Sequence, residues 1–324
     1  MIKKILFTLS LILIVSTSIT SCKKNTKKTE EKDKTTLTEN RNPFFKLSLA
    51  QWSLHRAIND KTLNPLDFAQ KAKELGFEGI EYVSGLYTEE LKNMGMKNLL
   101  DSLKAKSDRY NIQNVLIMVD GEGNLATSDE NERNEAVNNH KKWVDAAAFL
   151  GCHSIRVNLF GATTEEEWIV NATKGLKLLS EYGISKGINI IVENHGGLSS
   201  NAALLAQVIK NVDLDNCGTL PDFGNFCLKR EGGAQWNAKC IEEYDKYNGT
   251  KEMMPFAKGV SAKSYDFDAN GNETTLNYAR LLQIVKDAGY TGFIGVEYEG
   301  SRLSEEKGIQ ATKELLIKTV KTLD

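Results

Sequence analysis

Pairs of polar residues end several short apolar runs, and their types are suited to proton transfer or cation binding. "IVENH" ends in Glu193 and His195, and "GVEYEG" carries Glu297 and Glu299. Alternate residues of a strand share a face, so each pair points the same way if its run is a strand. Carboxylates act as general acids and bases and bind hard divalent ions. Burying such pairs is costly unless they line a wet or metal-filled site.

Other apolar runs end in one or two polar residues that could contribute to the same site. They are His55, Glu81, Asp120, Arg156 with Asn158, Asp222 with Asn225, and Lys263. One carboxylate at the end of a strand often only caps the next helix. Carboxylates after the fifth, sixth and eighth runs, together with an Arg nearby, favour a shared site.

The elements that must position these residues alternate along the chain. The predicted strands are "KLSLAQWSL", "EGIEYV", "QNVLIMVD", "SIRVNLF", "INIIVENH", "GTLPDFGN", "GVSAKSY" and "FIGVEYEG". The predicted helices are "NPLDFAQKAKELG", Leu99 to Tyr110, "HKKWVDAAAFLG", Glu165 to Lys186, Ala202 to Val212, "YARLLQIVKDAG" and Glu305 to Leu323, with an irregular segment from Leu228 to Lys258. Eight strands, each followed by a helix or a long connector, predict an α/β fold, a single (β/α)8 TIM barrel. An open doubly wound sheet is the alternative. In such barrels the reacting groups lie at the C-terminal ends of the strands.

The N-terminal residues read as a targeting segment. Lys3 and Lys4 precede an apolar stretch, Ile5 to Ile19, which leads to "ITSC" and Cys22. This resembles the lipobox of bacterial lipoproteins, and the resemblance implies cleavage before Cys22 and a lipid on its thiol; a plain signal peptide is the alternative. We therefore expect a signal peptide at 1–21, a disordered tether at 22–43 and the barrel at 44–324. An exported, membrane-anchored protein is expected, facing the periplasm rather than the cell surface.

Charge and cysteine content limit the partners and the compartment. The chain has 41 basic and 43 acidic residues and a net charge of −2, which disfavours nucleic acid as a partner. Cys152, Cys217, Cys227 and Cys240 share no CxxC spacing. A disulfide between Cys227 and Cys240 is compatible with an oxidising compartment, but buried free thiols are the interpretation that we favour. The oligomeric state is not indicated.

Three motifs resemble those of one family. "IVENH", "LPDFGN" and "GVEYEG" are similar to motifs of the xylose isomerase-like barrels, the sugar isomerase/epimerase superfamily, and the resemblance spans Lys46 to Leu323. It implies that Glu193, Asp222 and Glu297 hold one divalent metal and that the two Glu residues move the substrate proton. The family's fourth ligand is a His on the seventh strand, where this chain has Lys263. Relatives often have a His where this chain has Asn225.

Lys263 has three possible roles. In the first, a hard ion, Mn or Mg, stays and Lys263 contacts the substrate. In the second, the Lys263 ammonium replaces the metal as the electrophile. In the third, Lys263 is only a surface charge. We favour the first slightly.

The sequence thus predicts a sugar isomerase/epimerase-like enzyme, or a lyase, that abstracts a proton next to a carbonyl of an unphosphorylated sugar, keto-glycoside or polyol. The predicted catalytic residues are Glu193, Glu297 and Lys263; the predicted substrate-binding residues are His55, Glu81, Arg156, Asn158, His195 and Asn225. The alternative is a lipid-anchored, non-catalytic carbohydrate-binding protein on a degenerate isomerase barrel. Its best argument is the lost His.

Overall fold

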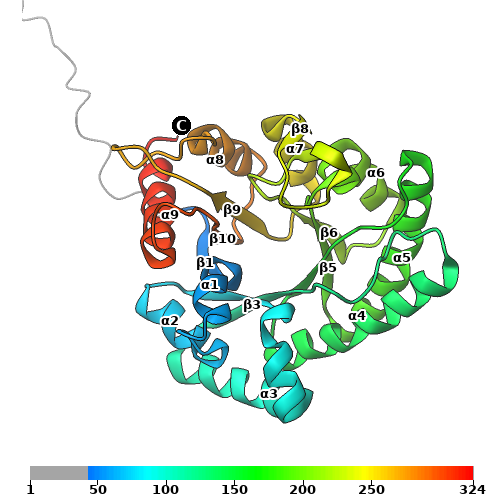
Figure 1. The fold of residues 1–324 in the computed structure, drawn as a ribbon, viewed down its shortest axis with the longest axis horizontal. Helices are drawn as coiled ribbons and strands as arrows, with labels where there is room; N and C mark the ends of the chain where they lie inside the picture. The colour runs from blue at the N-terminus through cyan, green and yellow to red at the C-terminus, as the bar shows by residue number, and fades with distance from the viewer. Residues whose placement is uncertain (1–42, 324) are drawn as a thin grey trace, which may run out of the picture. The chain divides into compact units, whose positions relative to one another are not determined.

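Eight parallel strands form the centre of the molecule (Figure 1). The computed structural model describes residues 43–323, so the predicted signal peptide, Cys22 and the tether up to residue 42 lie outside the described residues. The barrel strands are β1 (Lys46–Ala50), β2 (Gly79–Val83), β3 (Gln113–Met118), β4 (Ser154–Val157), β5 (Asn189–Glu193), β6 (Cys217–Leu220), β9 (Val260–Ser264) and β10 (Phe293–Tyr298). Their order is β6-β5-β4-β3-β2-β1-β10-β9. Parallel bridges from Thr219 to Ala257 and from Asp222 to Ser261 join the two outer strands, so the sheet closes into the predicted barrel.

Helices surround the strands, as the ribbon shows (Figure 1). The α-helices are α1 (His55–Asn59), α2 (Phe68–Glu74), α3 (Thr88–Tyr110), α4 (Glu130–Leu150), α5 (Glu165–Lys186), α6 (Ala202–Val212), α7 (Lys246–Met253), α8 (Tyr278–Asp287) and α9 (Glu305–Val320). Short 3-10 turns are η1 (Gln51–Leu54), η2 (Pro65–Asp67), η3 (Ser84–Tyr87), η4 (Gly197–Ser200), η5 (Glu231–Gly233) and η6 (Met254–Phe256). Gly151 ends α4 with φ 78°, a left-handed conformation that favours glycine and that explains the predicted stop.

The structure differs from the predicted boundaries in three places. Helix α4 begins at Glu130, ten residues before the predicted start at His140, because Asp129 caps it by accepting a hydrogen bond from the Glu132 amide. Helix α3 begins at Thr88 rather than Leu99 and bends at Gly95. The segment predicted to be irregular contains α7 and an antiparallel hairpin of β7 (Cys227–Arg230) and β8 (Cys240–Glu243).

A disulfide joins Cys227 to Cys240, with 5.8 Å between their Cα atoms. The favoured interpretation of these two residues as free thiols was therefore wrong. The hairpin pairs Arg230 with Cys240 and Cys227 with Glu243, which brings the two cysteines together. No local pattern predicted the hairpin, so there was no reason from the sequence to prefer the disulfide. Cys152 and Cys217 are buried free thiols, as predicted.

Peptide mapping under non-reducing conditions is expected to recover one linked peptide pair containing Cys227 and Cys240. Cys152 and Cys217 should react with an alkylating reagent only after unfolding, because both are buried and burial raises the pKa of both thiols. Rapid alkylation of Cys227 or Cys240 in the folded, unreduced protein would contradict the bridge.

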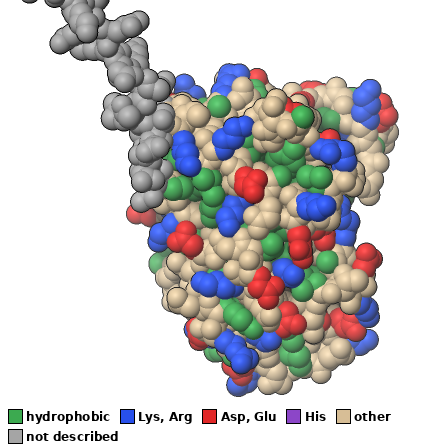
Figure 2. All heavy atoms as spheres, turned by 90° about the vertical axis from the view of Figure 1, so that its left-hand side faces the viewer, with side chains coloured by type: hydrophobic (Ala, Val, Ile, Leu, Met, Phe, Trp, Pro, Cys, Tyr) green, Lys and Arg blue, Asp and Glu red, His purple; other side chains and the backbone are tan. Residues whose placement is uncertain are grey.

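Below the strand ends, the interior of the barrel holds an apolar cluster beside the buried Ser48–Glu81 pair. Val115, Met118, Ile191, Leu220 and Phe293 pack there as one cluster, and a larger cluster fills the space between strands and helices. On the face shown in Figure 2, Lys and Arg side chains are interspersed with Asp and Glu. Among residues 43–323 no helix is long and apolar enough to cross a membrane.

Candidate active site

Strand register brings the acidic residues together. Lys263 of β9 and Glu297 of β10 are paired neighbours in the parallel sheet, so their side chains share a face. Ser261 lies on that same face, two residues before Lys263, and its bridge to Asp222 places the end of β6 beside it. Ser261 Oγ lies 2.6 Å from Asp222 Oδ2 and 2.9 Å from Glu297 Oε2. The hydroxyl therefore joins two carboxylates from opposite sides of the closing seam.

Three carboxylates converge at this seam. One oxygen each of Glu193, Asp222 and Glu297 lies within 4.8 Å of the other two, and all three residues are buried. Asp222 Oδ1 also accepts hydrogen bonds from the amides of Gly224 and Asn225, which fixes its orientation. Hard divalent ions favour such clusters of carboxylate oxygens.

The Lys263 ammonium lies beside two of these carboxylates, those of Asp222 and Glu297, and beside a further one, that of Glu299. Its Nζ is 3.2 Å from Glu297 Oε1, 3.4 Å from Glu299 Oε1 and 3.9 Å from Asp222 Oδ2. Lys263 is only 1% exposed, which excludes the surface-charge interpretation. Glu299 in turn accepts a hydrogen bond from Trp52 Nε1 at 2.5 Å. Lys263 thus supplies positive charge to the cluster.

A second cation, Arg156, organises the opposite side. Its Nε lies 2.9 Å from Glu193 Oε2, and its Nη1 donates to Asp120 Oδ1 at 2.9 Å. Asn158 Nδ2 donates to the same Asp120 oxygen, and Asn225 Nδ2 donates to Glu193 Oε1 at 3.0 Å. Both Glu193 oxygens therefore have partners.

Burial dominates the pKa values of the site. It raises the pKa of Asp222 to about 8, although Lys263 opposes the shift. Burial likewise raises the pKa of Glu297 against the opposing charge of Lys263. Burial alone would raise the pKa of Glu299, but Lys263 and the Trp52 hydrogen bond hold it below its usual range. Burial would lower the pKa of Lys263, yet Glu297 and its neighbours raise it well above the ordinary value. Neighbouring carboxyls thus differ in their tendency to be ionised, a common feature of catalytic sites.

A cavity of about 980 Å³ opens above this cluster. Of the predicted site residues, it is lined by Arg156, Asn158, His195, Asn225, Lys263 and Glu297. Glu193 and Asp222 lie just beneath the lining. His195 Nδ1 is 2.8 Å from Asn158 Oδ1, and burial lowers the pKa of His195 to about 3, with Arg156 and Lys263 adding to the shift. His195 is therefore a neutral imidazole at ordinary pH.

Two predicted substrate-binding residues are not brought to the cavity. Glu81 is buried inside the barrel, where its Oε1 accepts from Ser48 at 2.5 Å and burial raises its pKa to about 8. Gly295 makes room for it, because a Cβ there would lie 2.6 Å from the Glu81 carboxylate. His55 stacks on Trp52, with its Nδ1 2.6 Å from the Trp52 carbonyl oxygen. Trp52, not His55, lines the cavity.

Sequence reasoning did not consider several cavity residues for the site, among them Phe160, Arg230, Trp236 and Tyr265. Asp120 and Glu299 also line the cavity; the sequence analysis named them as strand-end acids that could share the site but assigned them no role. Arg230 and Trp236 come from the hairpin segment, whose sequence showed no helix or strand periodicity.

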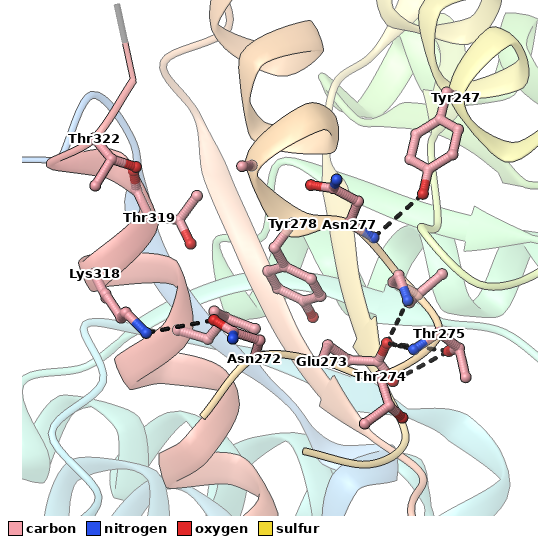
Figure 3. Close-up of a pocket in the computed structure, with 13 residues that line it drawn as sticks. Tyr247, Asn272, Glu273, Thr274, Thr275, Asn277, Tyr278, Lys318, Thr319 and Thr322 are labelled. Atoms are coloured by element: carbon pink, nitrogen blue, oxygen red, sulfur yellow. Dashed lines mark hydrogen bonds between the residues drawn. The ribbon is translucent and has the colours of Figure 1, made fainter. Parts of the chain in front are cut away.

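A second cavity, of about 520 Å³, lies between the β9–α8 loop and the helices α8 and α9 (Figure 3). The Glu273 carboxylate faces it but accepts hydrogen bonds from the amide and the hydroxyl of Thr275 and from the amide of Leu276. Lys318 points to Asn272, and the Asn277 amide donates to the Tyr247 hydroxyl. These groups stabilise the loop, so this cavity is not the candidate active site.

Comparison with known proteins places this geometry among related structures. A family model described as a xylose isomerase-like TIM barrel matches residues 69–319. A D-tagatose 3-epimerase-like protein superposes with a TM-score of 0.63 at 19% identity, over 86% of this chain and 98% of that one. A 3-keto-D-glucoside 4-epimerase from E. coli superposes with a TM-score of 0.61 at 15% identity, over 78% of this chain and 94% of that one. A xylose isomerase-like TIM barrel protein from Mycobacterium smegmatis, in complex with magnesium, superposes with a TM-score of 0.59 at 17% identity. The superposition covers 86% of this chain and 97% of that one.

Two curated proteins match short stretches. The alpha subunit of a 3'-dehydrocarminate deglycosidase from Microbacterium is 44% identical over 48 residues, 15% of this chain and 14% of that subunit. The C-glycoside deglycosidase alpha subunit of Arthrobacter globiformis is 35% identical over 54 residues, 17% of this chain and 15% of that subunit. The matched stretches therefore span about one seventh of these subunits.

Proposed function

The chain belongs to the xylose isomerase-like TIM barrel family, and from this premise we propose that it is an enzyme that removes a proton next to the carbonyl of a sugar. Its fold is that of sugar epimerases and isomerases. The observation that carries the proposal is the convergence of Glu193, Asp222 and Glu297 at the floor of a cavity, with the Lys263 ammonium 3.2 Å from Glu297 and 3.9 Å from Asp222. Isomerisation, epimerisation and β-elimination from a keto sugar all begin with this proton removal.

The two Glu residues divide the proton transfer. Glu297 lines the cavity and takes the proton from the carbon next to the carbonyl. Negative charge then develops on the carbonyl oxygen, and the Lys263 ammonium, 3.2 Å from Glu297, stabilises it. Glu193 donates a proton to the carbon from its own side, after taking one up from water, and Glu297 later releases the abstracted proton to water. Glu193 lies behind Arg156 and Asn225, which must move aside for it to take up that proton and reach the substrate.

The donor set fits a hard divalent ion. Five carboxylates, those of Asp120, Glu193, Asp222, Glu297 and Glu299, face two cations, Arg156 and Lys263. Without an ion, burial and the neighbouring carboxylates raise the pKa values of Asp222 and Glu297, and a bound cation would favour their ionised forms. Glu193, Asp222 and Glu297 would hold it, and Mn or Mg is the expected ion. When bound, such an ion polarises a carbonyl oxygen and stabilises negative charge on it.

The pairing of the cations with carboxylates also indicates whether the substrate carries a phosphate. Arg156 and Lys263, the two cations at the floor of the cavity, are already paired with carboxylates, so neither offers the reacting sugar an uncompensated positive charge for a phosphate. Arg230, the third cation of the lining, lies on the hairpin and donates to the Ala238 carbonyl. We therefore propose an unphosphorylated sugar, keto-glycoside or polyol. The relatives named for a keto-glucoside and for C-glycosides support a keto-glycoside among these.

The proposed location is the periplasm, with the protein exported and anchored to a membrane, rather than the cell surface. The Cys227–Cys240 disulfide supports an oxidising compartment, in keeping with export. A lipid on Cys22 would anchor the chain to the membrane and leave the barrel facing the periplasm.

Deuterium exchange tests the proposed activity. Ketoses, keto-glycosides and inososes are incubated with the protein in deuterated water, with and without Mn. NMR then measures the exchange of hydrogen for deuterium at the carbon next to the carbonyl. At least one compound should exchange faster than with heat-unfolded protein. Exchange with none of them, in either condition, would refute the proposal and leave the non-catalytic carbohydrate-binding protein as the better hypothesis.

A further inference from the structure

The cavity above the carboxylates is larger than one sugar ring requires, and one of its walls is aromatic. Phe160 follows β4, His195 follows β5, and Trp236 lies on the β7–β8 hairpin. The Trp236 ring centroid is 4.8 Å from that of His195 and 5.9 Å from that of Phe160. Three separate segments thus converge on one wall, opposite the Trp52 side of the cavity.

Trp236 is partly exposed although it is the largest apolar side chain on the hairpin. It is 39% exposed, and Ile241 on the same hairpin is 59% exposed. The other exposed large hydrophobic residues within 43–323 lie on α4 and α5, away from the cavity. An aromatic face left open beside a polar cavity favours a ligand with an apolar face of its own.

A neighbouring cavity of about 830 Å³ continues from this wall. It shares Phe160 and Arg230 with the cavity above the carboxylates, and Ile241 and Gly196 also line it. A ligand that starts at the carboxylates can therefore extend past Trp236 along the hairpin.

The hairpin is held in place, so the wall exists before a ligand binds. The Cys227–Cys240 disulfide ties its two strands, and Arg230 Nη1 donates to the Ala238 carbonyl at 2.8 Å. The Trp236 ring lies against Gly196, where a Cβ would be 3.6 Å away. Preorganisation of this kind lowers the entropic cost of binding.

We propose that Phe160 and Trp236 form a subsite for a second ring, so that the substrate is a glycoside whose reacting sugar lies over Glu297 and Lys263 and whose attached ring stacks on Trp236. This inference rests on the proposed function for the position of the reacting sugar. It narrows the substrate class from any unphosphorylated sugar to glycosides that carry a ring with an apolar face.

Calorimetric binding tests the subsite without requiring turnover. The probes are methyl and phenyl β-glycosides of glucose, galactose and xylose. In at least one pair the phenyl compound should bind roughly three- to tenfold more tightly, as expected for one aromatic stacking contact. Trp236→Ala should remove this preference, and Trp236→Phe should retain most of it. Phe149→Ala, which removes an exposed aromatic ring on α4, should leave it unchanged.

The outcomes separate this inference from the proposed function. Equal affinities within all three pairs, or a phenyl preference that survives Trp236→Ala, would overturn the subsite even if deuterium exchange occurs. A phenyl preference that depends on Trp236 would support the subsite even if no compound exchanges, in which case the proposed activity fails alone. Cellobiose in place of the phenyl glucoside tells whether a second sugar ring uses the same wall.

Discussion

Glu297→Gln is expected to lower the rate of deuterium exchange by roughly 10²- to 10⁴-fold at neutral pH, the range for loss of a general base. The amide keeps the shape of the side chain but cannot accept the proton. Glu297 is the carboxylate of the converging three that lines the cavity, so no neighbour of this set replaces it directly. The measurement is the NMR exchange assay with the best compound of the panel.

Glu193→Gln distinguishes the role of Glu193 in returning a proton from the role of Glu297 in removing one. If Glu193 returns a proton, this variant should still exchange the proton that Glu297 reaches, but should lose the stereochemical inversion or isomerisation of the product. Glu135→Gln, on the exposed face of α4, is the control and should behave as the unaltered protein. Full activity in a folded Glu297→Gln protein, checked by circular dichroism, would show that the assigned base is wrong.

Lys263→His is expected to create or tighten divalent metal binding. A neutral imidazole is a far better ligand than an ammonium, and it would join Glu193, Asp222 and Glu297, whose oxygens already converge. At a Mn concentration about 100-fold above Kd, binding adds about 2.7 kcal/mol to the free energy of unfolding. For a domain of this size that should raise Tm by roughly 5 °C. Metal analysis of the purified protein is the second readout.

Lys263→Met is the matched control, because it removes the charge and supplies no nitrogen ligand. Breaking a buried ion pair in this way costs about 3–5 kcal/mol of stability in the absence of metal. Lys263 lowers the pKa values of Asp222, Glu297 and Glu299, so its loss raises them. A base with a higher pKa ionises only at higher pH, and the acid limb of the pH–rate profile should move upward. Equal Mn affinity in the His and Met variants would mean that position 263 is not a ligand position.

Local sequence patterns were sufficient for the barrel. Helices α5 and α6 have the predicted bounds, because their apolar period and caps lie within the segment itself. The strands were found as apolar runs, and eight of them in alternation with helices specify closure. The start of α4 was missed because its first residues are polar and are held by a cap rather than by packing.

The sequence alone determined which residue types stand at the strand ends, and hence that Glu193, Asp222 and Glu297 would meet, because parallel strands end at one rim. It left open whether Lys263 faces the rim or the solvent, since a shift of one residue reverses the side of a strand. Only the tertiary structure decided that, together with the pairing of Arg156 with Glu193, the withdrawal of Glu81 into the barrel and the disulfide-tied hairpin that carries Trp236. These features depend on contacts between residues far apart in the chain, where register and packing select one partner among several that local patterns allow.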